Sequence, residues 1–173
     1  VAPPPGAFLQ ATAEGEAALL AAVREAVGPA KRIADLFAGC GTFALPLAEQ
    51  AEVLAVEGEA AMVGAMDRGW REAQGLHKVV SLTRDLFRRP LLPDELKLFD
   101  AVVIDPPRAG AAAQIAELAQ STVKVVAAVS CNPVTFARDA RVLVDAGFNL
   151  DWVQVVDQFR WSGHVELAAK FSR

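Results

Sequence analysis

The chain has 173 residues and a formal net charge of −4; 53% of the residues are hydrophobic and 22% are charged. This balance predicts one globular domain over residues 1–173 and excludes an intrinsically disordered chain. No apolar run approaches the roughly 18 residues that a membrane-spanning helix needs. The two cysteines lie far apart, which excludes a disulfide framework and a CxxC metal site, so we expect a protein of the reducing cytoplasm.

Helical and extended patterns alternate along the chain. Helices are predicted over residues 12–27, 43–50, 60–76, 111–120 and 133–146. Short apolar runs predict strands over residues 31–37, 53–57, 79–85, 99–105, 123–132, 148–159 and 164–171. The first helix has the clearest boundaries, because Thr12 can cap its N-terminus and Gly28 with Pro29 stops it. Residues 88–97 are expected to form a polar loop.

The order of these elements predicts the fold. Strands that alternate with helices and read as continuous apolar runs indicate a parallel sheet. The last two strands follow each other without a helix, so we expect them to form an antiparallel pair, the second alternating between buried and exposed side chains. The expected fold is therefore α/β and Rossmann-like, a mostly parallel seven-stranded sheet with helices on both faces and an antiparallel C-terminal strand.

A glycine turn marks the first candidate site. The segment DLFAGCGT (35–42) runs from a strand into a helix, and Gly39 and Gly41 let the backbone approach a ligand. Glu57 ends the next strand, at about the offset where a carboxylate meets ribose hydroxyls in nucleotide-binding folds. The turn and the carboxylate together predict a nucleotide-like cofactor, whereas a turn that only packs tightly is the alternative.

The residues after the turn narrow the choice of cofactor. Phe43 and Ala44 stand where the dinucleotide fingerprint has its third glycine, which disfavours NAD. S-adenosylmethionine has a ribose and an adenine but no pyrophosphate, so it fits this segment better. Asp85, which ends the third strand, is then expected to accept a hydrogen bond from the adenine amino group.

Two polar segments at strand ends form the second candidate site. DPPRAG (105–110) and SCNP (130–133) follow the fourth and fifth strands, so both belong at the carboxyl edge of the sheet, beside the cofactor. A free cysteine is usually a small buried hydrophobe. Cys131, however, stands at a strand-to-helix turn, where helix amides can lower a thiol pKa and favour a nucleophile. Cys40 would crowd the cofactor and is expected to be structural.

These segments resemble those of the RNA 5-methyluridine methyltransferases, which have a class I methyltransferase fold and modify uracils in transfer and ribosomal RNA. The resemblance covers nearly the whole chain, in the same order. It rests on FLQ (8–10), DLFAGCGTF (35–43), VEGE (56–59), DPPRAG (105–110), SCNPVTFARD (130–139) and HVE (164–166). SCNPxTxxRD together with DPPRxG is its specific part, because most methyltransferases share the glycine turn.

The resemblance implies a role for each matching residue. Cys131 is the implied nucleophile and Glu166 the implied base. Arg108 is implied to brace the site, with Asn132 and His164 as further supports. The implied lining of the cofactor and target-base pocket is Gln10, Phe37, Thr42, Glu57, Asp85 and Asp105, beside the glycines of the turn.

The chemistry of uracil methylation explains these residue types. C5 of uracil is too poor a nucleophile to take a methyl group directly, but a thiolate that adds to C6 turns C5 into an enolate carbon. A base must then remove the C5 proton before the thiolate leaves. Because a base inside a helix cannot present C6 to a thiol, the target must lie in a loop or be flipped out.

The chain departs from the family pattern in three places, of which the first and third affect RNA binding and the second affects the cofactor turn. The RNA-binding β-barrel usual ahead of this domain is missing, so we expect a fragment whose RNA contacts lie partly elsewhere, in keeping with the net charge of −4. Thr42 stands where the family often has asparagine. The segment QFRWSGHVE (158–166) lacks the proline and the threonine or histidine usual before HVE.

Other functions stay open on the sequence alone. A class I methyltransferase acting on another nucleobase position or on protein needs no thiol, and a domain that binds S-adenosylmethionine without its RNA-binding part needs no catalysis. The sequence distinguishes neither transfer from ribosomal RNA nor one oligomeric state from another. Two histidines without clustered partners predict no metal site.

Overall fold

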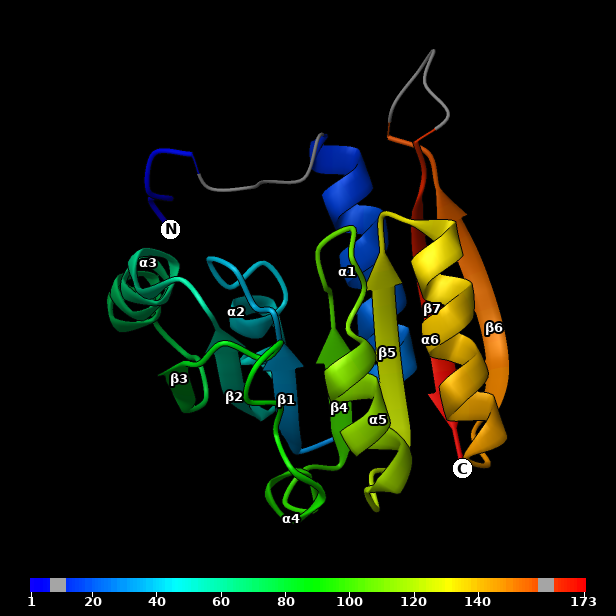
Figure 1. Ribbon diagram of the computed structural model, residues 1–173. Coiled ribbons are helices and arrows are strands. Elements are labelled where there is room, and N and C mark those ends of the chain that lie inside the picture. The colour runs from blue at the N-terminus through cyan, green and yellow to red at the C-terminus, as the bar shows by residue number, and fades with distance from the viewer. Residues whose placement is uncertain (7–11, 159–163) are drawn as a thin grey trace.

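The computed structural model of the protein describes residues 1–6, 12–158 and 164–173. Within them, a seven-stranded sheet forms the centre of the molecule (Figure 1). Its strands are β1 Arg32–Leu36, β2 Glu52–Glu57, β3 Val79–Thr83, β4 Ala101–Ile104, β5 Val125–Ser130, β6 Asn149–Val156 and β7 Glu166–Ser172. All seven predicted strands are confirmed, whereas Gln10 lies outside the described residues.

The strands lie in the order β3-β2-β1-β4-β5-β7-β6 (Figure 1). The first five strands of this order are parallel to one another, and β7 is antiparallel to both β5 and β6, as predicted. The direction in which the chain adds strands reverses between β1 and β4. Open α/β sheets bind ligands outside the carboxyl ends of the strands at such a point, so the topology directs a ligand to the ends of β1 and β4.

Helices cover both faces of the sheet. They are α1 Ala13–Val27, α2 Ala44–Leu47, α3 Ala60–Glu72, α4 Pro93–Leu96, α5 Ala112–Gln120 and α6 Pro133–Asp145. The first three pack on one face, in a core that includes Leu19 and Met66. The last three pack on the other, in a core that includes Leu118 and Leu143. None of the helices in the described part of the chain is long and apolar enough to cross a membrane.

The predicted boundaries are confirmed for the first helix but not for the next two. Thr12 caps α1 as predicted, because its Oγ1 accepts a hydrogen bond of 3.0 Å from the Gly15 amide, and Gly28 ends the helix with φ +56°. The predictions for the next two helices are too long, since α2 has four residues and α3 ends at Glu72. The predicted loop 88–97 contains the short helix α4, which starts with a proline.

The surroundings of β7 differ from the prediction. Its first four residues, 166–169, are all buried, so the expected alternation is wrong. The reason is that β7 lies between β5 and β6, and the exposed edge strand is β6 instead. Because β7 runs antiparallel to β5, its first residues reach the end of β5, where Leu167 pairs with Ser130. This pairing brings Glu166 to the turn that carries Cys131.

Candidate cofactor and catalytic site

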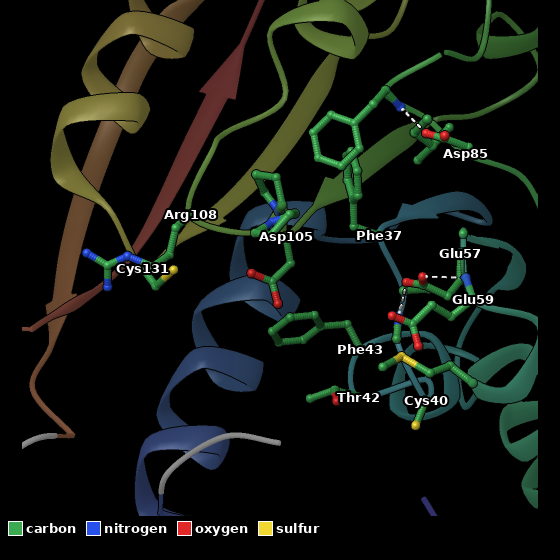
Figure 2. Close-up of a pocket in the computed structure, with 18 of the residues that line it drawn as sticks. Phe37, Cys40, Thr42, Phe43, Glu57, Glu59, Asp85, Asp105, Arg108 and Cys131 are labelled. Atoms are coloured by element: carbon green, nitrogen blue, oxygen red, sulfur yellow. Dashed lines mark hydrogen bonds between the residues drawn. The ribbon is translucent and has the colours of Figure 1, made fainter. Parts of the chain in front are cut away.

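A pocket of about 640 Å³ opens at the carboxyl ends of the parallel strands. Figure 2 shows side chains from the turns after β1, β2, β3, β4 and β5 around it. Of the predicted site residues, those that line it are Phe37, Gly39, Thr42, Glu57, Asp85, Asp105, Arg108, Cys131 and Glu166. The two candidate sites of the sequence are therefore one cavity.

The glycine turn is tied to the end of β2 by Glu57. The Gly39 amide donates a 2.9 Å hydrogen bond to Glu57 Oε2, and the Glu59 amide donates one of 2.9 Å to Oε1 (Figure 2). Each carboxylate oxygen keeps further acceptor capacity, since an ionised carboxylate offers about four lone-pair sites. Glu57 can therefore hold the turn and still receive hydroxyl groups of a ligand.

Gly41 acts in packing rather than in the pocket lining. Its φ is +91°, and a Cβ built on it would lie 2.9 Å from Leu45 and 3.0 Å from Met66. Only glycine allows this backbone conformation at this close approach to α3. Gly41 does not line the pocket, and its contact with a cofactor stays a prediction.

The far end of the pocket combines a carboxylate with two aromatic rings. Asp85 Oδ1 accepts hydrogen bonds from the amides of Phe87 (2.9 Å) and Arg88 (3.3 Å). The rings of Phe37 and Phe87 lie 5.3 Å apart between centroids. Phe37 has φ +62°, the one positive value outside glycine among the described residues. Such strain concentrates at functional sites, and here it accompanies a ring at the pocket.

Two carboxyl groups with raised pKa values lie at the carboxyl ends of β1 and β4, and one of them, Asp105, lines the pocket. Asp35 is fully buried, and neither of its carboxylate oxygens has a hydrogen-bond partner among the described residues. Burial first, and then the charge of Asp105, raise the pKa of Asp35 well above its usual range. Burial and the neighbouring Glu166 raise the pKa of Asp105 to about 7. Both groups disfavour their ionised forms until a positive charge arrives.

Cys131 lies in the pocket, with its sulfur between Arg108 and Asp105 in the view of Figure 2. It follows β5 and precedes Asn132, the N-cap of α6. Burial first, then Glu166 and Asp105, raise the pKa of the thiol, and Arg108 opposes them. Burial and the carboxyl groups therefore outweigh the backbone hydrogen bond that lowers this pKa, and the net direction is opposite to the expected one.

Glu166 is almost completely buried, with 3% of its surface exposed. Burial raises the pKa of its carboxyl group, and the Arg108 guanidinium acts in the opposite direction. A solvated strand residue, the ordinary interpretation of a lone glutamate, is thereby excluded. The raised pKa makes this carboxyl group a better proton acceptor than an ordinary glutamate.

Arg108 links the residues implied as supports. Its Nη1 lies 3.3 Å from Nδ1 of the exposed His164. Asn132 caps α6 by accepting from the Val134 amide (3.1 Å), and its Nδ2 donates to the Arg108 carbonyl oxygen (2.9 Å). Asn132 and His164 therefore lie outside the pocket lining and contact it through Arg108.

Several residues of the lining were not predicted from the sequence, among them Glu59, Met62, Leu86 and Phe87. Glu59 and Phe87 each stand two residues after a predicted site residue, a spacing that could have indicated the same turn. Cys40, expected to be structural, is buried but also lines the pocket. In residues 1–6, 12–158 and 164–173, no cluster of three or more His, Cys, Asp or Glu side chains is arranged to hold a metal ion.

Comparison with known proteins identifies relatives of the chain. The model of the tRNA (uracil-5-)-methyltransferase family matches residues 72–173. An uncharacterized RNA methyltransferase of Mesorhizobium japonicum is 57% identical over 169 residues, which are 98% of this chain and 41% of the relative. The 23S rRNA (uracil(1939)-C(5))-methyltransferase RlmD of Yersinia enterocolitica is 41% identical over 151 residues, which are 84% of this chain and 33% of the relative.

Solved structures share the fold. The tRNA (uracil-54, C5)-methyltransferase of Pyrococcus abyssi, in complex with S-adenosyl-L-homocysteine, has a TM-score of 0.81 and 30% identity; the match covers 96% of this chain and 40% of that one. Magnesium protoporphyrin IX methyltransferase of Synechocystis, at 18% identity and a TM-score of 0.71 over 92% of this chain and 84% of that one, shows the fold alone. The predicted Rossmann-like class I methyltransferase fold is confirmed.

The chain spans about two fifths of the length of the first curated relatives it matches. The family model, however, matches more than half of the chain itself, from residue 72 to its end. That stretch contains the DPPRAG, SCNPVTFARD and HVE segments. The chain belongs to the tRNA (uracil-5-)-methyltransferase family.

Proposed function

We propose that the protein transfers a methyl group from S-adenosylmethionine to C5 of a uracil in RNA, through a covalent bond between Cys131 and C6 of the base. The observation that carries this proposal is that Cys131, Arg108 and Glu166 border the same pocket as the glycine turn. The names of two relatives support it, since one acts on a uracil C5 in 23S rRNA and the other on uracil 54 of tRNA.

The residues of the pocket fit a positively charged nucleoside. Glu57 would hold the ribose hydroxyls, and Asp85 and Phe37 would hold the adenine. Burial and neighbouring carboxyl groups raise the pKa values of Asp35 and Asp105, and a cationic ligand offsets both effects. When bound, S-adenosylmethionine supplies an electrophilic methyl group on a positive sulfur.

In the proposed reaction, the Cys131 thiolate bonds to C6 of uracil, and the C5–C6 π electrons move into an enolate. C5 then bonds to the methyl carbon as the bond from that carbon to the donor sulfur breaks. Glu166 takes the C5 proton, and the electrons of that C–H bond restore the C5–C6 double bond as Cys131 leaves as a thiolate. From the thiolate onward, every bond that forms is matched by one that breaks, and the cycle ends with Cys131 as a thiolate and the C5 proton on Glu166.

The charged neighbours of Cys131 determine when the thiol can react. Asp105 and Glu166 raise the pKa of the thiol, and Arg108 lowers it. Protonation of either carboxyl group, or arrival of a positive methyl donor, removes part of the repulsion of the thiolate. Arg108 keeps its charge throughout, since a guanidinium is not deprotonated in proteins.

The test uses RNA that contains 5-fluorouridine, with tRNA and 23S rRNA fragments in separate arms. Fluorine cannot leave C5 as a proton, so in the presence of S-adenosylmethionine a methylated protein–RNA complex should accumulate and map to Cys131. Cys131→Ser should yield no complex. Asp145→Asn, at an exposed position near the end of α6, serves as a matched control with undiminished yield.

Other outcomes favour the competing functions. Full turnover on RNA after Cys131→Ser would contradict covalent catalysis and favour methylation at another nucleobase position. Calorimetric binding of the cofactor without binding of either RNA would favour a cofactor-binding domain that does not capture RNA alone.

A further inference from the structure

The backbone of the loop after β4 lies against the first turns of α6. The N-cap residue Asn132 and one side chain of α6 contact the carbonyl oxygen of Arg108. Asn132 Nδ2 donates to it at 2.9 Å, and the Thr135 hydroxyl lies 3.2 Å from both this oxygen and the Asn132 carbonyl oxygen, so it shares its one proton between them. These contacts fix the Cα that carries the Arg108 side chain relative to α6.

The next residues of the loop are held by an ion pair one turn further along α6. The Ala111 amide donates to Asp139 Oδ2 at 2.8 Å, and Arg138 Nη2 donates to the Ala109 carbonyl oxygen at 3.2 Å. Arg138 Nε in turn donates to Asp139 Oδ1 at 2.9 Å. Asp139 is buried, with 8% of its surface exposed, so its hydrogen bonds lie in a setting where charge-assisted contacts are strong.

Gly110 makes this close packing possible. It has φ +75°, and a Cβ at this position would lie 2.4 Å from Arg138 Nη2, 2.7 Å from Asp139 Oδ2 and 3.0 Å from Thr135 Cβ. A side chain at residue 110 would push the loop away from α6. Glycine at position 110 therefore allows the four contacts of Asn132, Thr135, Arg138 and Asp139 with the backbone of residues 108–111 to form together.

None of these side chains lines the pocket, yet the loop they hold carries a residue that does. Arg108 lines the pocket with Cys131 and opposes the carboxyl groups that disfavour the thiolate. We propose that Thr135, Arg138 and Asp139 are positioning residues that hold Arg108 beside Cys131 by fixing the backbone of residues 108–111. The inference rests on the proposed function of Cys131 as a nucleophile.

The ionisation of Cys131 gives a readout that a purely structural role would not move. The peptide containing Cys131 is followed by mass spectrometry while iodoacetamide alkylates the intact protein at a series of pH values, and the midpoint of the rate reports the thiol pKa. Arg108→Gln should raise this midpoint by roughly 1 pH unit, because a positive neighbour is lost. No RNA is needed, so the assay is independent of methylation.

Asp139→Asn should raise the midpoint in the same direction as Arg108→Gln. The sign is informative, because loss of a negative charge at Asp139 would by itself lower the pKa of a nearby thiol. Combining Asp139→Asn with Arg108→Gln should add nothing, since the arginine through which Asp139 acts is already gone. Asp145→Asn, whose partner Arg141 lies on the same helix, should leave the midpoint unchanged.

A midpoint that stays unchanged or falls in folded Asp139→Asn overturns the proposal, as does a double variant whose shifts add. If thermal unfolding shows that Asp139→Asn is not folded, Thr135→Val decides by the same criterion, because it removes only the hydroxyl that contacts the carbonyl oxygens of Arg108 and Asn132. If neither the parent protein nor any folded variant methylates RNA, the proposed function is contradicted. The alkylation result still tests the positioning of Arg108, because it needs no RNA.

Discussion

The affinity for S-adenosylmethionine should depend on pH through Asp105. The pKa of this carboxyl group is about 7 in the protein without ligand, because burial and Glu166 disfavour its ionised form. A cationic ligand at the pocket favours the ionised form and lowers the pKa of Asp105 toward the ordinary range of about 4. Below pH 7 the group must therefore lose a proton on binding.

This linkage fixes the sign and size of the effect. The dissociation constant should be nearly constant above pH 8 and should rise as the pH falls through 7, becoming about tenfold larger at pH 6. Isothermal titration calorimetry in buffers of different protonation enthalpy should then show release of about one proton at pH 6 and almost none at pH 8.

Two controls isolate Asp105 from Glu166, Asp35 and Cys131, whose pKa values are also raised. Asp105→Asn should bind more weakly at high pH and lose most of the slope. S-adenosylhomocysteine, which lacks the positive sulfur, should show a smaller slope on the parent protein. A dissociation constant that is flat from pH 6 to 8, or a slope that survives Asp105→Asn, would refute the reasoning.

Three substitutions test other parts of the site. Glu166→Gln should lower turnover by about 100-fold or more while the Cys131–RNA adduct still forms, because only removal of the C5 proton is lost; gel assays of adduct and product separate the two steps. Glu57→Gln should weaken cofactor binding by calorimetry about tenfold, since two charge-assisted bonds to backbone amides weaken. Gly41→Ala should lower the free energy of unfolding by about 1–3 kcal/mol in urea titrations, because the new Cβ strains the backbone and meets Leu45 and Met66.

Residues at the ends of parallel strands were predictable because such ends share one edge of a sheet. Gly39, Glu57, Asp85 and Asp105 stand at the carboxyl ends of β1 to β4, and the rule that open α/β sheets bind ligands at this edge brings them together without further information. Their shared pocket depends only on strand order. The sequence alone could not predict that the Glu57 carboxylate accepts hydrogen bonds from two backbone amides.

Glu166 could not be placed by such a local rule. Its position depends on β7 entering the sheet antiparallel between β5 and β6, and the pairing with β5 joins residues that lie 37 or more positions apart along the chain. The same insertion buries both faces of β7, which is why alternation within residues 164–171 misled the prediction. The thiol pKa of Cys131 was misjudged for a related reason, since Asp105 and Glu166 reach it from other segments.

Because the pocket contains more acidic than basic side chains, the ionisation of Cys131 depends on the position of Arg108. Among the described residues of the lining, Arg108 is the one basic side chain, and the acidic ones are Glu57, Glu59, Asp85, Asp105 and Glu166. This excess of carboxyl groups favours a cationic methyl donor but disfavours a thiolate at Cys131. In the proposed mechanism, a cationic methyl donor bound beside Cys131 would offset part of this repulsion and favour the thiolate. Because the charge of a guanidinium does not vary with pH in this range, the distance of Arg108 from the sulfur is what the protein can adjust, and that distance is set by the backbone that Asp139 and Thr135 hold.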